Sequence, residues 1–206
     1  MVAIIDYDAG NIKSVQKAIE KLGGQACLSR DAKTLLEADH VILPGVGSFG
    51  EAMEKLKKYG LLPIITQIIE RKIPFLGICL GMQLLFEESD ESPGVKGLSI
   101  LAGKVKRIPT KDKLKIPHIG WNSLDFPRQG RLFRGIKEEA YVYFVHSYYL
   151  QAKKEDIVVA TTEYGRQLHV AVEAGNIFAC QFHPEKSGEI GLSILKNFIE
   201  IERGDN

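Results

Sequence analysis

The chain has 206 residues, and its 45% of hydrophobic and 26% of charged residues are ordinary for a globular protein. A balance of 27 basic against 26 acidic residues argues against a primary role on nucleic acid or on an anionic membrane. This length predicts a single domain covering residues 1–206, with a core large enough to need no disulfide or metal.

Three further features favour a cytoplasmic protein. The longest apolar stretches, such as residues 61–69, are shorter than the roughly 20 residues that span a bilayer. The sequence begins with Met1 and an apolar run, without the basic segment and cleavage site of an export signal. The three cysteines cannot all pair, and none has metal-ligand spacing to another, so we expect a reducing compartment, no metal and no cofactor.

Strand and helix signals alternate along the first half of the chain. Apolar runs predict strands over residues 2–6, 25–29, 40–43 and 74–78. Apolar residues at helical spacing predict a helix that Asn11 caps and that Gly23-Gly24 ends, then helices over 49–59, 61–71 and 80–88. This alternation predicts an α/β fold with a doubly wound, mostly parallel central sheet and flanking helices.

The second half has a different pattern. Residues 141–150, 157–164, 170–173 and 177–182 are rich in β-branched and aromatic residues with turns between them, which predicts an antiparallel extension of the sheet. Residues 187–202 form an amphipathic pattern that predicts a closing helix.

Cys79 stands between two glycines, after an apolar strand and before a helix. This is the arrangement of a nucleophile elbow, with cysteine in place of serine. A helix N-terminus favours the thiolate, which is the reactive form. A buried structural cysteine is the alternative, and it is the better interpretation for Cys27 and Cys180, which lack this context.

A thiol nucleophile needs a base, and the base needs a group that orients it. His183 is followed by Pro184 and Glu185 at the end of an apolar run. The carboxylate can hold the imidazole in one tautomer and stabilise its charged form. A surface His-Pro-Glu turn is the alternative, but an elbow cysteine upstream favours a Cys79–His183–Glu185 triad.

Residues 44–47 (PGVG) directly follow a predicted strand. Glycines let the backbone turn its amide groups toward a ligand, as the oxyanion of a tetrahedral intermediate requires. We expect donors near Val46 and Gly47, and a second donor in the Leu80 amide. An ordinary strand-ending turn is the alternative.

Residues 44–47 (PGVG), 77–83 (GICLGMQ) and 183–185 (HPE) together resemble the signatures of class I glutamine amidotransferases, in order and in spacing. Further segments are similar to the glutaminase subunits of imidazole glycerol phosphate synthases. They are residues 7–12 (YDAGNI), 44–50, 84–89 (LLFEES), 93–98 (PGVKGL), 117–122 (PHIGWN) and 143–148 (YFVHSY).

The resemblance implies hydrolysis of glutamine to glutamate and delivery of ammonia to a (β/α)₈-barrel cyclase subunit in a heterodimer. The cyclase makes imidazole glycerol phosphate and an aminoimidazole carboxamide ribotide in histidine biosynthesis. Carried over by motif position, the residues expected to hold glutamine are Gln83 and Glu91, with Gly47 and the backbone at Ser147 and Tyr148. Those expected to face the cyclase are Asn11, Trp121 and Lys186.

Alternatives remain at this point. A glutaminase subunit for pyridoxal phosphate or anthranilate synthesis would keep the chemistry and change the partner. A non-catalytic regulatory homologue, or a cysteine peptidase or chaperone on a similar sheet, would change the function. Residues 104–115 hold six basic side chains, and they form either a solvated face or an edge that docks the cyclase.

Overall fold

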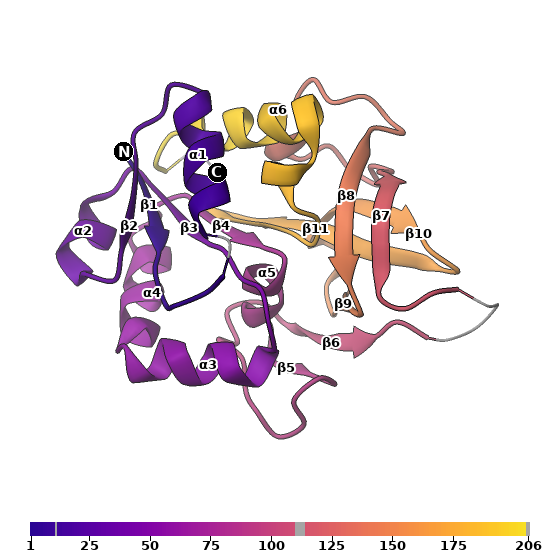
Figure 1. Ribbon diagram of the computed structural model, residues 1–206, viewed down its shortest axis with the longest axis horizontal. Helices are drawn as coiled ribbons and strands as arrows, with labels where there is room; N and C mark the ends of the chain where they lie inside the picture. Colours follow the sequence, from indigo (N-terminus) through magenta and orange to yellow (C-terminus); the bar gives the residue numbers. More distant parts are fainter. Residues whose placement is uncertain (11, 110–113, 205–206) are drawn as a thin grey trace.

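The computed structural model describes residues 1–10, 12–109 and 114–204. Within them, ten strands form one mixed sheet in the order β2-β1-β3-β4-β12-β11-β9-β6-β5, with β10 paired to β11. Helices cover both faces of this sheet (Figure 1), so the predicted α/β fold class is confirmed. The predicted partner-facing residue Asn11 lies outside the described residues.

The first half of the chain forms the parallel part of the sheet. Its strands are β1 (Val2–Ile5), β2 (Ala26–Ser29), β3 (His40–Leu43) and β4 (Phe75–Ile78). The helices between them are α1 (Ile12–Lys21), α2 (Ala32–Glu37), α3 (Phe49–Lys58) and α4 (Leu61–Glu70). The chain ends with α6 (Gly188–Ile199), which lies beside α1 on one face of the sheet, while α3 and α4 lie on the other (Figure 1).

Side-chain alternation along the strands builds a core on each face. Successive residues of a strand point to opposite faces, so Ala3 and Ile5 join a cluster beneath α3 and α4. Val2 and Ile4 join a second cluster beneath α1 and α6. Both faces are therefore covered, which is why the four residues of β1 are all apolar and buried.

The second half extends the sheet with antiparallel strands, as predicted. Its members are β6 (Gly103–Arg107), β9 (Tyr148–Ala152), β10 (Val158–Glu163), β11 (Gln167–Ala174) and β12 (Ile177–Cys180). The last of these, β12, lies between the two halves, parallel to β4 and antiparallel to β11. At the edge, the two-residue strand β5 (Glu88–Ser89) pairs parallel to β6. Short 3₁₀ helices η2 (Arg131–Phe133), η3 (Glu155–Ile157) and η4 (Pro184–Lys186) occupy the connections.

The prediction of one strand over residues 141–150 is wrong. The chain breaks at Ser147 into β8 (Tyr141–His146) and β9, which belong to different sheets. β8 pairs with β7 (His118–Ser123) in a separate sheet, which has two strands among the described residues, and the sequence did not predict β7. Apart from His146 and Ser147 the segment 141–150 is apolar and aromatic, and it contains no Gly or Pro, so these two polar residues are its one local signal for the break.

The prediction of a helix over residues 80–88 is also wrong in length. The helix α5 spans only Leu80–Leu84. Beyond it, the carbonyl groups of Leu84 and Phe86 accept hydrogen bonds from Leu98 and Ser99, and β5 begins at Glu88. A tertiary contact therefore replaces the helical hydrogen bonds. β6 and the helix α2 were likewise not predicted. The N-cap of α2, Asp31, accepts a hydrogen bond from the Thr34 amide at 2.8 Å.

Candidate active site

Cys79 lies at the turn between β4 and α5 and has an unusual backbone conformation. Its φ of 54° and ψ of −109° are costly for a residue with a side chain. The two flanking glycines make the turn feasible, because a Cβ on Gly77 would lie 2.8 Å from the Gly81 carbonyl oxygen. A Cβ on Gly81 would lie 1.9 Å from the Leu43 carbonyl oxygen. The packing around Cys79 therefore leaves no room for a side chain at either flanking glycine.

Cys79 opens onto a cavity of about 270 Å³ at the carboxyl end of the parallel strands. Its walls come from the loop after β3, the start of α5 and the loop that follows it, and the junction of β8 and β9. The lining residues predicted for the site are Val46, Gly47, Cys79, Leu80, Gln83, Glu91, Ser147, Tyr148 and His183. Pro117, Val145 and His146 line it as well, and the sequence analysis did not select them.

His183 and Glu185 form a buried pair at the end of β12. Nδ1 of His183 lies 2.9 Å from Oε1 of Glu185, and their side chains are 2% and 1% exposed. Nε2 of His183 has no hydrogen-bond partner of normal geometry among the described residues, but the Cys79 sulfur is close enough to act on the pKa of the ring. Burial lowers the pKa of His183, but the Cys79 sulfur and the Glu185 carboxylate outweigh it and raise the pKa to about 10. This arrangement favours the imidazolium form of His183.

The loop between β3 and α3 presents exposed Val46 and Gly47 to the cavity. Gly47 has a φ of +101° and open space around its Cα, whereas Gly45 is tightly packed against the Tyr7 hydroxyl and the start of α5. On the opposite wall, the Leu80 amide is in the first turn of α5, where amides have no acceptor within the helix. Both predicted groups of oxyanion donors therefore border the same cavity as Cys79.

The groups predicted to hold a substrate have their own partners. Nε2 of Gln83 donates to the Tyr148 carbonyl at 3.3 Å, which leaves Oε1 of Gln83 as its acceptor. The Ser147 carbonyl accepts from the Ile108 amide. Glu91 accepts a hydrogen bond from the Phe49 amide at 2.7 Å, so its carboxylate is held at the cavity wall. A ligand would therefore meet the amide groups of this wall and the free oxygens of Gln83 and Glu91.

The family described as Glutamine amidotransferase class-I matches residues 3–201, which contain all of these groups. The chain belongs to this family. It is 50% identical over 202 residues to "Imidazole glycerol phosphate synthase subunit HisH" from Moorella thermoacetica, a match covering 98% of this chain and 95% of that one. A relative of the same name from Methanocaldococcus jannaschii is 51% identical over 201 residues, covering 98% of this chain and 100% of that one.

A solved structure described as "Crystal structure of glutamine amidotransferase" has the same fold, with a TM-score of 0.75 at 21% identity. It covers 97% of this chain and 98% of that one.

Two buried residues of this amidotransferase were missed by the sequence analysis. The Tyr7 hydroxyl donates to the Pro44 carbonyl at 2.9 Å and anchors the start of the 44–47 loop. Burial, and to a lesser degree the charge of Cys79, raises the pKa of Tyr7, so its hydroxyl stays protonated. Gln181 places Nε2 at 3.6 Å from the Cys79 sulfur. The only signal for Gln181 was a polar residue within the apolar run 177–182.

The two predicted partner-facing residues that the structure describes, Trp121 and Lys186, are both on the surface. Trp121 on β7 is 54% exposed, and Lys186 on η4 is exposed. Ile119 and Tyr141, from β7 and β8, are 60% and 57% exposed, so the small sheet presents large apolar side chains to solvent. Exposed apolar surface of this kind marks interaction sites.

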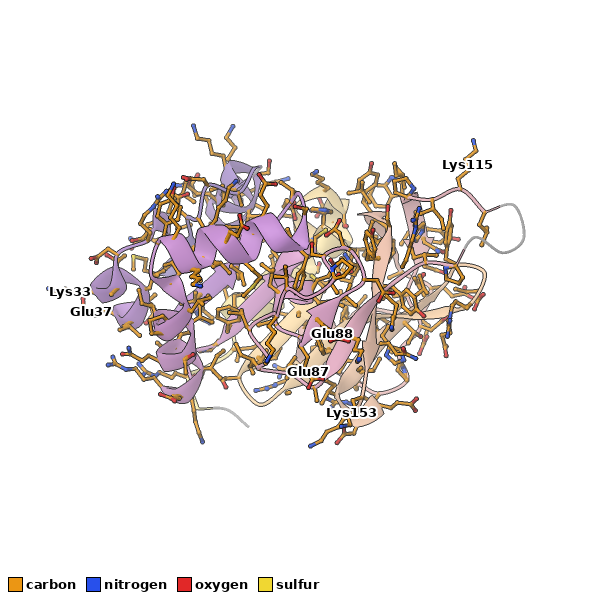
Figure 2. All side chains as sticks on the ribbon, turned by 90° about the horizontal axis from the view of Figure 1, so that it is seen from below. Lys33, Glu37, Glu87, Glu88, Lys115 and Lys153 are labelled. Atoms are coloured by element: carbon orange, nitrogen blue, oxygen red, sulfur yellow. The ribbon has the colours of Figure 1, made fainter. Side chains whose placement is uncertain are left out.

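In the described part of the basic stretch 104–115 the basic side chains are for the most part solvated, and Lys111 and Lys113 lie outside the described residues. Lys104 pairs with Glu88, and Lys106 lies 3.4 Å from Asp90. Lys115 extends away from the body of the amidotransferase, as do Lys33 and Lys153 elsewhere on the surface (Figure 2). These positions favour a solvated face over a dedicated docking edge. None of the helices in the described part of the chain is long and apolar enough to cross a membrane.

Proposed function

We propose that this chain is the glutaminase subunit of an imidazole glycerol phosphate synthase, with Cys79, His183 and Glu185 as its catalytic triad. The observation that carries the proposal is the buried His183–Glu185 pair on the same cavity as a strained elbow cysteine. The relatives named HisH, which match over nearly their whole length, support the choice of synthase.

The triad would hydrolyse glutamine in two stages. The Cys79 thiolate attacks the carboxamide carbon, and amides near Gly47 and at Leu80 stabilise the oxyanion. His183 gives its proton to the leaving ammonia, so the products of the first stage are ammonia and a thioester. His183, held by Glu185, then takes a proton from water as the water attacks the thioester, which releases glutamate and restores the thiolate.

The substrate would lie between Gln83 and Glu91. The carboxylate of Glu91 suits the α-ammonium group of glutamine, and Oε1 of Gln83 adds an acceptor. Amides of the Ser147–Tyr148 segment can bind the α-carboxylate. The chemistry requires no metal and no cofactor.

The partner would be the cyclase subunit, a (β/α)₈ barrel that uses the ammonia to make imidazole glycerol phosphate and aminoimidazole carboxamide ribotide in the cytoplasm. Trp121, Lys186 and Asn11 would face it in a heterodimer. An exposed Trp among other apolar side chains is typical of an interface anchor.

The test is an assay of glutamine hydrolysis and of cyclase product, with and without the purified cyclase subunit. Cys79→Ala in the assembled complex should abolish the glutamine-dependent reaction and leave the reaction with ammonium salts intact, because the cyclase performs that chemistry. Wild-type glutaminase activity in Cys79→Ala would disprove the triad. Failure of the cyclase to bind or to use the ammonia would point to another synthase or to a regulatory role.

A further inference from the structure

Gln181 is a fully buried residue that the proposed triad does not use. It lies one residue beyond β12, between Cys180 and Phe182. Its amide has one partner on each side: Nε2 is 3.6 Å from the Cys79 sulfur, and Oε1 accepts from Nε2 of Gln83 at 2.9 Å. The buried Gln181 amide is therefore held in a defined position between the nucleophile and the amide of Gln83.

The direction of these hydrogen bonds is determined by a backbone group. The Tyr148 carbonyl can only accept, so Gln83 must present its NH₂ group to it. The same NH₂ group then meets the oxygen of Gln181, and the nitrogen of Gln181 is left facing the sulfur. Nδ1 of His146 donates to the same Tyr148 carbonyl at 2.8 Å, so this carbonyl, from which the series of amide hydrogen bonds begins, is held in place by a second donor.

The geometry points to Gln181 as a positioning residue that donates a hydrogen bond to the Cys79 sulfur, with its direction set by the Tyr148 carbonyl through Gln83. The inference rests on the proposed role of Cys79 as the nucleophile. A hydrogen bond to an ionised acceptor is roughly twice as strong as one to a neutral acceptor, so this donor favours the thiolate over the thiol. It also holds the sulfur in a single orientation on the cavity wall.

Other titratable groups surround the Cys79 sulfur, and the variants used in the test leave them unchanged. His183 and Cys180 face it from β12 and its extension, and Tyr7 faces it from the end of β1. Glu185 acts from behind His183, His146 lies beside His183 on β8, and Glu91 lines the opposite wall of the cavity.

The experiment measures the rate at which iodoacetamide alkylates Cys79 in the isolated chain, from about pH 5 to about pH 10, by mass spectrometry of the Cys79 peptide. It requires neither glutamine nor a partner subunit. Gln181→Leu removes the donor and keeps much of the shape. We expect the midpoint of its alkylation profile to rise by about one pH unit, which corresponds to a roughly tenfold slower reaction near neutral pH.

A variant that introduces a negative charge and a structural control make the result specific. Gln181→Glu puts a carboxylate beside the sulfur and should raise the midpoint further than Gln181→Leu. Thr162→Val also removes a hydrogen bond from a fully buried side chain, the 2.6 Å bond to the Ser123 carbonyl, but it lies outside the chain of amides. Its profile should match that of the wild type.

A folded Gln181→Leu variant with the wild-type alkylation profile would overturn the inference. If that variant does not fold, Gln83→Glu tests the proposed hydrogen bond in its place. Its carboxylate can only accept, so the Gln181 amide turns its NH₂ group away from the sulfur, and the midpoint should rise. An unchanged midpoint in Gln83→Glu would overturn the proposed direction. Normal alkylation of wild-type Cys79, together with no glutamine hydrolysis by the complex with the cyclase subunit, would refute the proposed function instead.

Discussion

At the scale of single residues, the site depends on groups whose charge is set by their neighbours. His183 is buried, yet its pKa is raised because the Cys79 sulfur and the Glu185 carboxylate both favour the imidazolium. In the proposed mechanism this ring must carry a proton to the leaving ammonia. The charged form of His183 is therefore a requirement for activity, and it gives the enzyme a limit at high pH.

The first prediction concerns that limit. Because the active form needs protonated His183, kcat/KM for glutamine should fall as pH rises through about 10. Glu185→Gln removes one of the two groups that raise this pKa, so the fall should move to lower pH by about one to two units. The variant should lose less activity than Cys79→Ala, because Glu185 orients the ring and does not transfer the proton.

The measurement is a pH–rate profile of the cyclase complex with wild type, Glu185→Gln and the control Glu189→Gln. Glu189 is an exposed carboxylate on α6, so its replacement should leave the profile unchanged. A high-pH limb at the same position in Glu185→Gln and wild type would contradict the assignment.

At the scale of elements, the active site depends on the close approach of a strand, a turn and a helix. α5 is only five residues long, so the helix dipole behind Cys79 is smaller than a helix over 80–88 would provide. The position of Cys79 is determined instead by packing, because Gly81 lies against the carbonyl of Leu43 at the end of β3. The Leu80 amide and the Cys79 sulfur are held by the same contact.

The second prediction tests this packing with two glycine variants. In Gly81→Ala the new Cβ would meet the Leu43 oxygen at 1.9 Å, so β3 and α5 must separate. We expect a loss of about 1–3 kcal/mol of unfolding free energy and a fall in glutaminase rate of at least about tenfold. Gly60→Ala is the control, because Gly60 has a φ of +66° and open space beside it, between α3 and α4.

Gly60→Ala should cost about 1–2 kcal/mol of stability through backbone strain, and it should keep full activity. Denaturant unfolding and the glutaminase assay together separate the two variants. Full activity in Gly81→Ala would show that this contact does not position the nucleophile.

At the scale of the whole molecule, the active-site loop and the proposed partner face belong to one body. Val46, which is 39% exposed, borders the cavity, and Trp121 is exposed on the small sheet whose strand β8 leads into Ser147. A partner bound to Trp121 could therefore influence both cavity walls. Ammonia released without an acceptor is lost, so we expect the isolated chain to be a poor glutaminase.

The third prediction is that partner binding, and then the nucleotide ligand of the cyclase, raises the glutaminase rate. We expect a peptide unit of the 44–47 loop to turn its amide toward the oxyanion when the partner is bound. One missing oxyanion donor typically lowers the rate by about 10²–10³, so stimulation of this order is expected. The glutaminase rate should be measured for the chain alone, for the complex, and for the complex with cyclase ligand.

Gly47→Ala is the informative variant for this loop, because Gly45 is tightly packed and its replacement would disturb the fold as well. The positive φ of Gly47 disfavours a side chain, so Gly47→Ala should reduce the stimulation. Equal rates in all three states of the wild type would remove the coupling hypothesis. Undiminished stimulation in Gly47→Ala would keep the coupling and exclude this peptide unit as its switch.

The sequence by itself determined the parallel half of the sheet, the elbow at Cys79 and the pairing of His183 with Glu185. These features depend on neighbouring residues: apolar runs between turn residues, glycines beside a cysteine, and a proline between an acid and a base. Local patterns of this kind persist whatever the rest of the chain does.

Only the tertiary structure decided which distant segments meet. The parallel pairing of β12 with β4, with Cys180 opposite Ile78, brings His183 beside Cys79. The break at Ser147, the early end of α5 and the contact of Gln181 with the sulfur all depend on partners far along the chain. No residue near these positions specifies its partner, because hydrogen bonds between distant segments form only once the strands have assembled.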